Sequence, residues 1–320
     1  MNFARYIYVL LIILTIKYFY SKYNDKLFIN DKEKDYHLVR EYLLNKNENF
    51  NKRPILWIHN THNINARNWS SFYSRNSNDL NQPYLFLTIR SIINKCGNDF
   101  NVCLIDDNSF NKLIKNYTIN LSNLPDPIRS HNRQLALLKL LDNYGGMMVP
   151  NSFLCVENLI NVHYETISQN KPFVFECVNN RNIMSSYKTF GPELFISTPP
   201  QNPCIKYIIN ELEIRNSKDY TDEPNFEGTL GRLFNQCIYD NQMISLSPKI
   251  NGTQQANDEP VLLENLFGNS PLKMDKFLGV YIPADEILKR IKYQWFARLS
   301  PQQILESDTF IGNLFLIHSQ

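Results

Sequence analysis

The chain has 320 residues, of which 43% are hydrophobic, so it is long enough for one large α/β domain or two small ones with a substantial core. Its formal net charge is only +2, and its 33 basic and 31 acidic residues are intermingled. Because no basic stripe stands out, the composition excludes a typical nucleic-acid-binding protein, and no nucleic-acid partner is predicted.

The N-terminal segment is the first predicted element and the clearest change in composition. Residues 6–16 form an uninterrupted apolar or aromatic run, which the aromatic residues 18–20 extend with side chains favoured at a membrane interface. Residues 1–23 are therefore predicted to be a transmembrane signal-anchor, and the protein is predicted to be a single-pass membrane protein held by residues 6–20. A cleaved signal peptide is the alternative, but no small-x-small cleavage site follows the run.

Residues 24–52 are polar and charged, which is typical of a stem, and residues 53–320 are predicted to form the globular domain. The domain opens with Ile55–His59, a short apolar run that is typical of a buried parallel strand followed by a loop. His59 and His62 are three residues apart, but there is no helix and no third ligand beside them. They are interpreted as loop residues, and no metal site is predicted there.

The second predicted strand, Phe100–Ile105, ends at two adjacent acids. A carboxylate pair such as Asp106 and Asp107, at the carboxyl end of a parallel strand, lies where α/β proteins bind their ligands. A structural role is favoured over ligand binding, because residues 107–109 are also suited to cap a helix over 111–115.

The central stretch, Arg129–Cys155, combines a helix, a glycine turn and an extended run. A stripe of leucines over 135–141 predicts one buried face of the helix, and Gly145–Gly146 ends it and leads into Met147–Cys155. Helix, glycine turn and buried strand therefore follow one another.

This order resembles the DxD glycosyltransferases with a GT-A nucleotide-sugar fold, including capsular-polysaccharide-synthesis proteins. In that family a helix ending in Tyr-Gly-Gly is followed, three residues later, by an Asp-x-Asp metal site. The chain keeps Tyr144–Gly146, and its text YGGMMVPNSFLC also resembles that of glycosyltransferase-like membrane proteins of giant DNA viruses. The resemblance implies an α/β fold with a mixed, mainly parallel sheet flanked by helices, on a host endomembrane or virion membrane.

The residues that carry the chemistry of that family differ here. Pro150, Asn151 and Ser152 occupy the Asp-x-Asp positions, and Gln134 and Leu137 occupy those of the sugar-binding Asp and Arg. Mn²⁺ and Mg²⁺ are hard cations that need anionic oxygen ligands, and Asn151 offers only a neutral carbonyl oxygen. Strong metal binding is therefore not expected.

The resemblance implies a donor site at the edge of the sheet. The loop with His59 and Asn60 would contact the nucleotide, and Asn151 would lie beside it. Arg129 and Arg133, near the start of the central helix, could hold a diphosphate in place of a metal because guanidinium groups supply fixed, bidentate charge. Ordinary exposed arginines are the alternative.

A late acidic pair, Asp258 and Glu259, is the candidate catalytic base, because a carboxylate can accept a proton from an acceptor hydroxyl. Solvated loop acids in front of a helix are the alternative.

The cysteines show no Cys-x-x-Cys spacing, so no zinc site is predicted. Buried free thiols are favoured over disulfides, which the even number of cysteines leaves open. They stand at positions 96, 103, 155, 177, 204 and 237.

The sequence leaves two functions open. In the first, the domain is a membrane-bound hexosyltransferase that uses a nucleotide sugar as donor, without the usual metal and with no other cofactor predicted. In the second, it is a catalytically inactive glycosyltransferase-fold protein that binds a glycan or partner, or has a structural role, at a viral or cellular membrane. The absence of the signature acids favours the second, because a fold alone does not fix a function.

Overall fold

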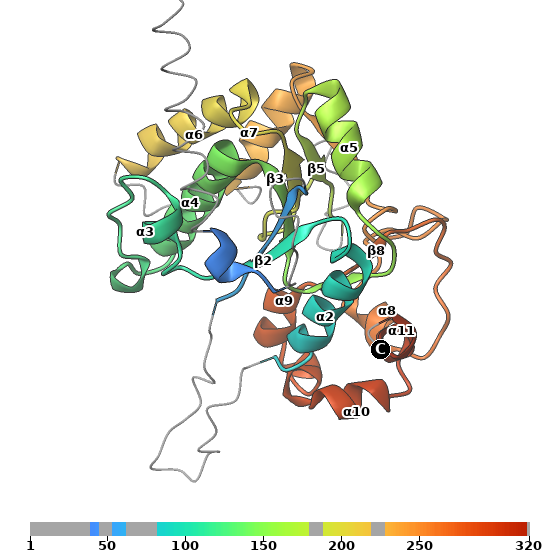
Figure 1. The fold of residues 1–320 in the computed structure, drawn as a ribbon. Coiled ribbons are helices and arrows are strands. Elements are labelled where there is room, and N and C mark those ends of the chain that lie inside the picture. Colours follow the sequence, from blue (N-terminus) through green and yellow to red (C-terminus); the bar gives the residue numbers. More distant parts are fainter. Residues whose placement is uncertain (1–38, 45–52, 62–81, 179–187, 219–227, 319–320) are drawn as a thin grey trace, which may run out of the picture. The chain divides into compact units, whose positions relative to one another are not determined.

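The structure is a computed structural model that describes residues 39–44, 53–61, 82–178, 188–218 and 228–318 (Figure 1). The predicted anchor and most of the predicted stem lie outside these ranges. Residues 1–42 and 43–320 are separate compact units, and the described part of the first contains the short 3-10 helix η1, Arg40–Tyr42. Among the helices in the described ranges, none has the length and apolar character needed to cross a bilayer.

A six-stranded sheet forms the centre of the larger unit, with the strand order β2-β1-β3-β6-β5-β7. Its strands are β1 Ile55–His59, β2 Asn101–Ile105, β3 Gly146–Pro150, β5 Phe173–Phe175, β6 Ile196–Thr198 and β7 Ile244–Leu246. Neighbours are parallel except at β6, which runs antiparallel to both β3 and β5. The predicted mixed, mainly parallel sheet is confirmed. Because His59 is level with both Ile105 and Pro150, the carboxyl ends of β1, β2 and β3 meet at one edge.

The sheet gains a short addition at its β2 edge. Leu43 forms an antiparallel bridge with Cys103, and the Leu44 N–H donates to the Val102 carbonyl over 2.9 Å. These two leucines, which the sequence analysis assigns to the stem, are therefore paired with the globular unit.

The run predicted as one extended segment, Met147–Cys155, consists of two strands. β3 ends at Pro150, a residue without the N–H needed to continue a ladder, and a turn at residues 151–152 separates it from β4, Phe153–Cys155. β4 pairs antiparallel with β8, Gly279–Tyr281, in a second sheet. The chain thus passes from the large sheet into the small one at the position of the missing Asp-x-Asp pair.

Helices flank the sheets, as predicted (Figure 1). The longer ones are α2 Leu85–Cys96, α4 Ile128–Tyr144, α5 Ile160–Gln169, α6 Pro203–Asn216, α7 Gly228–Tyr239 and α11 Phe310–His318. The shorter ones are α3 Phe110–Leu113, α8 Leu263–Phe267, α9 Ala284–Lys289 and α10 Pro301–Leu305, with 3-10 turns η4 Leu121–Asn123, η5 Ile291–Tyr293 and η6 Phe296–Arg298. Helix α4 packs on α6, which packs on α7, while α8, α10 and α11 pack together near the small sheet.

Strand β4 separates two hydrophobic cores. Side chains alternate along a strand, so Phe153 and Cys155 face the core around β1, β2 and α2, whereas Leu154 faces the core built with Val280, Phe296 and the C-terminal helices. The position of the turn at residues 151–152 is consequently fixed by packing on both sides.

The glycine pair after α4 allows β3 to enter the sheet. Gly145 and Gly146 have φ angles of +65° and +97°, in the region that favours glycine. A Cβ atom on Gly146 would lie 2.2 Å from the carbonyl oxygen of Ile55, and one on Gly145 would lie 2.7 Å from the backbone nitrogen of Pro200. Only glycine therefore permits this approach of β3 to β1 and to the loop after β6.

We predict that Gly146→Ala lowers the free energy of unfolding by at least about 3 kcal/mol, because it combines a strained φ angle with a backbone clash. Urea denaturation of the full-length chain measures the change. The control is Gly231→Ala in α7, where the nearest atom to the added Cβ lies 3.9 Å away, and which we expect to be stabilising by up to about 1 kcal/mol. Equal stability of the two variants would contradict this account of the turn.

Candidate functional site

The carboxyl edge of β1, β2 and β3 brings several predicted donor-site residues together. Asp107 Oδ1 accepts hydrogen bonds from His59 Nε2 at 2.9 Å and from Arg133 Nε at 2.8 Å, and Asp107 Oδ2 accepts one from Arg133 Nη2 at 2.6 Å. The His59 ring stacks on Phe110, with ring centroids 5.6 Å apart. Three residues thus form one connected group: His59 of β1, Asp107 of the loop after β2, and Arg133 of α4.

The charges of this group neutralise one another. Burial works to raise the pKa of Asp107, but hydrogen bonds from Arg133 and His59 outweigh it and hold that pKa well below its usual range. The bond to Asp107 in turn raises the pKa of Arg133. Because the guanidinium group donates two bonds to a carboxylate, Arg133 does not offer an uncompensated positive charge to a diphosphate.

Two other predicted residues have local structural contacts. Asp106 Oδ1 accepts from the N–H and the hydroxyl of Ser109, at 2.9 and 2.6 Å, and so closes the turn before α3. The predicted cap formed by residues 107–109 is wrong, because Ser109 makes no side-chain cap bond at the start of α3 and Asp107 turns towards Arg133. Arg129 Nε donates to the carbonyl of Leu124 over 2.7 Å.

The Asp-x-Asp positions are occupied by neutral, largely bonded groups. Asn151 Nδ2 donates to Asn60 Oδ1 over 2.9 Å, and the Asn151 carbonyl accepts from the Thr88 hydroxyl. Asn151 Oδ1 is buried and has no hydrogen-bond partner among the described residues. The Ser152 hydroxyl donates to Glu193 Oε2 over 3.4 Å. The turn at residues 151–152 is therefore bonded to Asn60 at the strand edge through Asn151 and to the carboxyl group of Glu193 through Ser152.

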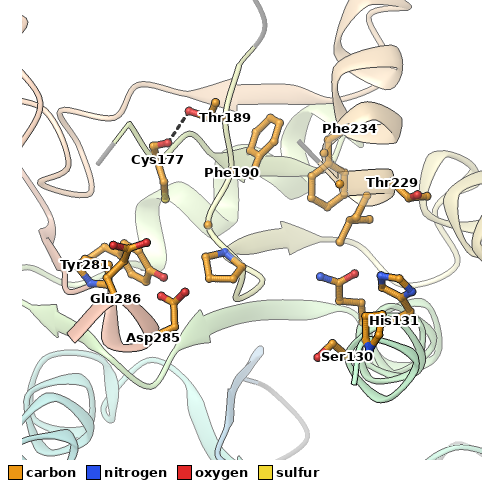
Figure 2. A pocket seen from close by; sticks show the side chains of 18 of the residues that line it. Ser130, His131, Cys177, Thr189, Phe190, Thr229, Phe234, Tyr281, Asp285 and Glu286 are labelled. Atoms are coloured by element: carbon orange, nitrogen blue, oxygen red, sulfur yellow. Dashed lines mark hydrogen bonds between the residues drawn. The ribbon is translucent and has the colours of Figure 1, made fainter. Parts of the chain in front are cut away.

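A cavity of about 400 Å³ lies beyond that carboxyl group (Figure 2). Its lining comes from Pro127 and the first turns of α4, Cys177, residues 188–192, the first half of α7 and residues 281–289. Figure 2 shows Ser130 and His131 on one side of the cavity and Tyr281, Asp285 and Glu286 on the other. The lining also includes Gln134, which stands where the resembled family has its sugar-binding Asp.

The lining combines aromatic, hydroxyl, amide and carboxyl groups. Its two lysines are in ion pairs: Lys188 Nζ lies 2.9 Å from Glu176, and Lys289 Nζ lies 2.8 Å from Asp285. Asp285 Oδ1 is buried and makes no hydrogen bond within the part of the chain that the structure describes. The cavity therefore suits a polar, uncharged ligand.

Glu193 is the perturbed acid of this region, and the sequence analysis does not identify it. Burial, reinforced by the nearby Asp285 and only partly offset by the bond from Ser152, raises the pKa of Glu193 to about 7. Burial, then Glu193 and other acids, also raises the pKa of Tyr281. Glu193 follows Pro192 of the cavity lining, so a carboxyl group with a pKa of about 7 is adjacent in sequence to the lining. A lone acid within the apolar run 190–197 is the only sequence signal for it.

The predicted catalytic acids lie elsewhere. Asp258 and Glu259 are in an exposed loop, neither lines the cavity, and the Asp258 carboxylate lies 2.9 Å from Lys249 Nζ. Their catalytic role stays a prediction. His62 lies outside the described residues, and within the described ranges no group of three or more His, Cys, Asp or Glu side chains is placed to hold a metal.

We predict that Asp107→Asn lowers the free energy of unfolding by about 2 kcal/mol at pH 7, because it leaves the half-buried Arg133 without its counter-charge. The native pKa of Asp107 is depressed, so its contribution is complete above the unfolded pKa of about 4 and decreases progressively as the pH falls from there towards the native pKa. The difference between the variant and the wild type should therefore be smaller at pH 3 than at pH 7. Urea denaturation at pH 7 and pH 3 tests this. The control, Glu213→Gln, removes a surface ion pair with Lys139 and should change stability by less than about 0.5 kcal/mol.

The raised pKa of Glu193 predicts a pH-dependent effect of Glu193→Gln. Between the unfolded pKa, near 4.5, and about 7, the native state binds more protons than the unfolded state, so wild-type stability falls as the pH rises. The glutamine variant lacks this fall. Its stability relative to wild type should rise by roughly 1 to 3 kcal/mol between pH 5 and pH 8, as measured by urea denaturation. A difference that does not change with pH would contradict the assignment.

A glycosyltransferase of known structure is similar to this chain. No family model matches the chain, and no curated protein matches it. Among solved structures, the chain is similar to the PaToxG glycosyltransferase, with a TM-score of 0.31 and 15% sequence identity. The match covers 66% of this chain and 75% of that one.

Proposed function

We propose that the chain is a glycosyltransferase-like membrane protein that transfers a hexose from a nucleotide sugar to a glycan or protein without an Asp-x-Asp metal site. One observation carries the proposal: a polar cavity of about 400 Å³ has both of its lysines in ion pairs. Its lining includes Pro192, and the next residue, Glu193, is bonded to Ser152 in the turn after β3. Ligand pockets of roughly 300–1,000 Å³ take small molecules, so the size of the cavity suits a sugar.

The chemistry of the lining supports a hexosyl group as the ligand. A sugar is neutral and has many hydroxyl groups, so it needs donors and acceptors on several sides and no net charge. Gln134 and His131 can donate or accept on one wall, and Asp285, paired with Lys289, lies on the other. Phe190 offers an aromatic surface for the apolar face of a ring. The position of Gln134 in the Tyr-Gly-Gly helix agrees with the sugar contact that the family resemblance implies.

The start of α7 supports release of a nucleoside diphosphate without a metal. Gly228 and Thr229 line the cavity at the N-terminal end of this twelve-residue helix. A helix N-terminus carries partial positive charge and backbone N–H groups that stabilise anions. Such fixed dipoles would offset the charge that develops on the leaving phosphate, which is the task of the metal in DxD enzymes. Membrane anchoring through residues 6–20 is part of the proposal.

The proposal predicts that the full-length chain, purified in detergent, binds a UDP- or GDP-hexose equally well with and without Mn²⁺ in a calorimetric titration. Gln134→Ala should weaken binding about tenfold, because it removes one hydrogen-bonding side chain from the sugar. The matched control is Glu213→Gln on the exposed face of α6, which should bind as wild type does. No binding at millimolar ligand would refute the proposal, and binding that requires Mn²⁺ would refute its metal-free part.

A second function is favoured by a separate observation. The edge residues that a donor nucleotide would contact are bonded to one another, through Asp107 with Arg133 and through Asn60 with Asn151. A catalytically inactive protein that binds only a glycan would have this arrangement. Turnover separates the two: the first function predicts slow release of free UDP or GDP from the bound nucleotide sugar, and the second predicts binding of a free oligosaccharide with no such release.

A further inference from the structure

Four of the six buried cysteines form two pairs across neighbouring elements. The Sγ atoms of Cys96 and Cys155 lie 3.8 Å apart, where the end of α2 packs on β4. Cys204 in α6 and Cys237 in α7 are close enough that each shifts the pKa of the other, and these helices also pack together. Each pair therefore joins two elements that are already in contact.

We propose that both pairs are disulfides in the mature protein, Cys96 with Cys155 and Cys204 with Cys237, formed while the chain folds in an oxidising compartment. A disulfide has an S–S distance of about 2.05 Å and joins side chains that approach closely from adjacent backbones. Cys96 and Cys155 are on elements that are already packed together, with their sulfur atoms 3.8 Å apart. The predicted signal-anchor would deliver the domain to the kind of compartment in which disulfides persist.

The two electrons removed from each cysteine pair are accepted by an oxidant that contains a disulfide, either a small molecule or a protein. One cysteine thiolate attacks a sulfur of that disulfide and forms a mixed disulfide, and the second thiolate then displaces the other half. Each pair loses two protons and two electrons and gains one S–S bond, while the oxidant becomes two thiols. Since all four thiols are buried in the folded chain, the exchange takes place before folding is complete.

The first cross-link would hold the turn that replaces the Asp-x-Asp pair. Helix α2 contacts this turn through the bond from the Thr88 hydroxyl to the Asn151 carbonyl. The same helix accepts a bond from the Cys155 N–H at the Ser91 hydroxyl, over 2.9 Å. A bond between Cys96 and Cys155 would fix α2 against β4 and thereby keep Asn151 in place.

The second cross-link would hold one wall of the cavity. Helix α7 lines the cavity with its first residues, Gly228–Gly231, and Cys237 lies two turns further along the same helix. A bond to Cys204 would tie this helix to α6. Both cross-links therefore act on elements that shape the candidate site, although neither depends on the function proposed for it.

The remaining cysteines are internal controls. Burial raises the pKa of Cys103, whose thiol donates to the Asn101 carbonyl, and burial raises the pKa of Cys177 to about 12. Both are expected to remain thiols.

Peptide mapping of the full-length wild-type chain, expressed in eukaryotic cells with its own N-terminus, tests the proposal. Free thiols are blocked with N-ethylmaleimide in denaturant, and the chain is digested without reduction. We expect two cross-linked peptides, each lighter by two hydrogen atoms than its reduced parts, with Cys103 and Cys177 alkylated. Alkylation of all six cysteines, or a cross-link that involves Cys103 or Cys177, would overturn the proposal. If one cross-link is absent, the proposal fails for that pair.

Thermal unfolding provides a second measurement. Reduction with dithiothreitol should lower the melting temperature of the wild-type chain by several degrees. The double variant Cys96→Ser, Cys155→Ser should show a smaller decrease, and Cys103→Ser should show the full decrease. An unchanged wild-type melting temperature after verified reduction would contradict the cross-links.

Discussion

The fold depends on the close approach of β3 to β1 at Gly146, where any side chain would meet the Ile55 carbonyl oxygen. This contact sets β3 between the parallel strand β1 and the antiparallel strand β6, at the centre of the six-stranded sheet. It also determines where β3 ends, because Pro150 is level with His59. The chain then turns into the second sheet, so the position of Asn151 and Ser152 follows from the glycine contact five residues earlier.

The turn after β3 connects two regions of different chemistry. On one side, Asn151 donates a hydrogen bond to Asn60 at the sheet edge where Asp107 and Arg133 form an ion pair. On the other side, the Ser152 hydroxyl donates to Glu193, whose pKa burial raises to about 7 and which follows Pro192 of the cavity lining. Hydrogen-bonding groups therefore occupy the turn on both sides.

Local patterns made the framework predictable, whereas the site depends on contacts between distant segments. The apolar run of β1 and the glycine pair after α4 are short-range signals, and the structure has the strand and the turn at those residues. The partner of Asp107 is 26 residues away, on α4, so sequence reasoning assigned this acid to a helix cap. Glu193 has an unusual pKa only because folding encloses it beside Asp285. Exposed Asp258 and Glu259 were chosen because they are adjacent acids, a feature that carries no information about burial.

The central claim is that the cavity holds a hexosyl group without a metal, and a crystal structure of the full-length chain with a UDP- or GDP-hexose, grown in the presence of a chelator, tests it most directly. The account predicts the hexose between Gln134 and Asp285, with the diphosphate at the start of α7. An empty cavity with the ligand bound elsewhere, or a ligand that appears only when Mn²⁺ is supplied, would contradict it.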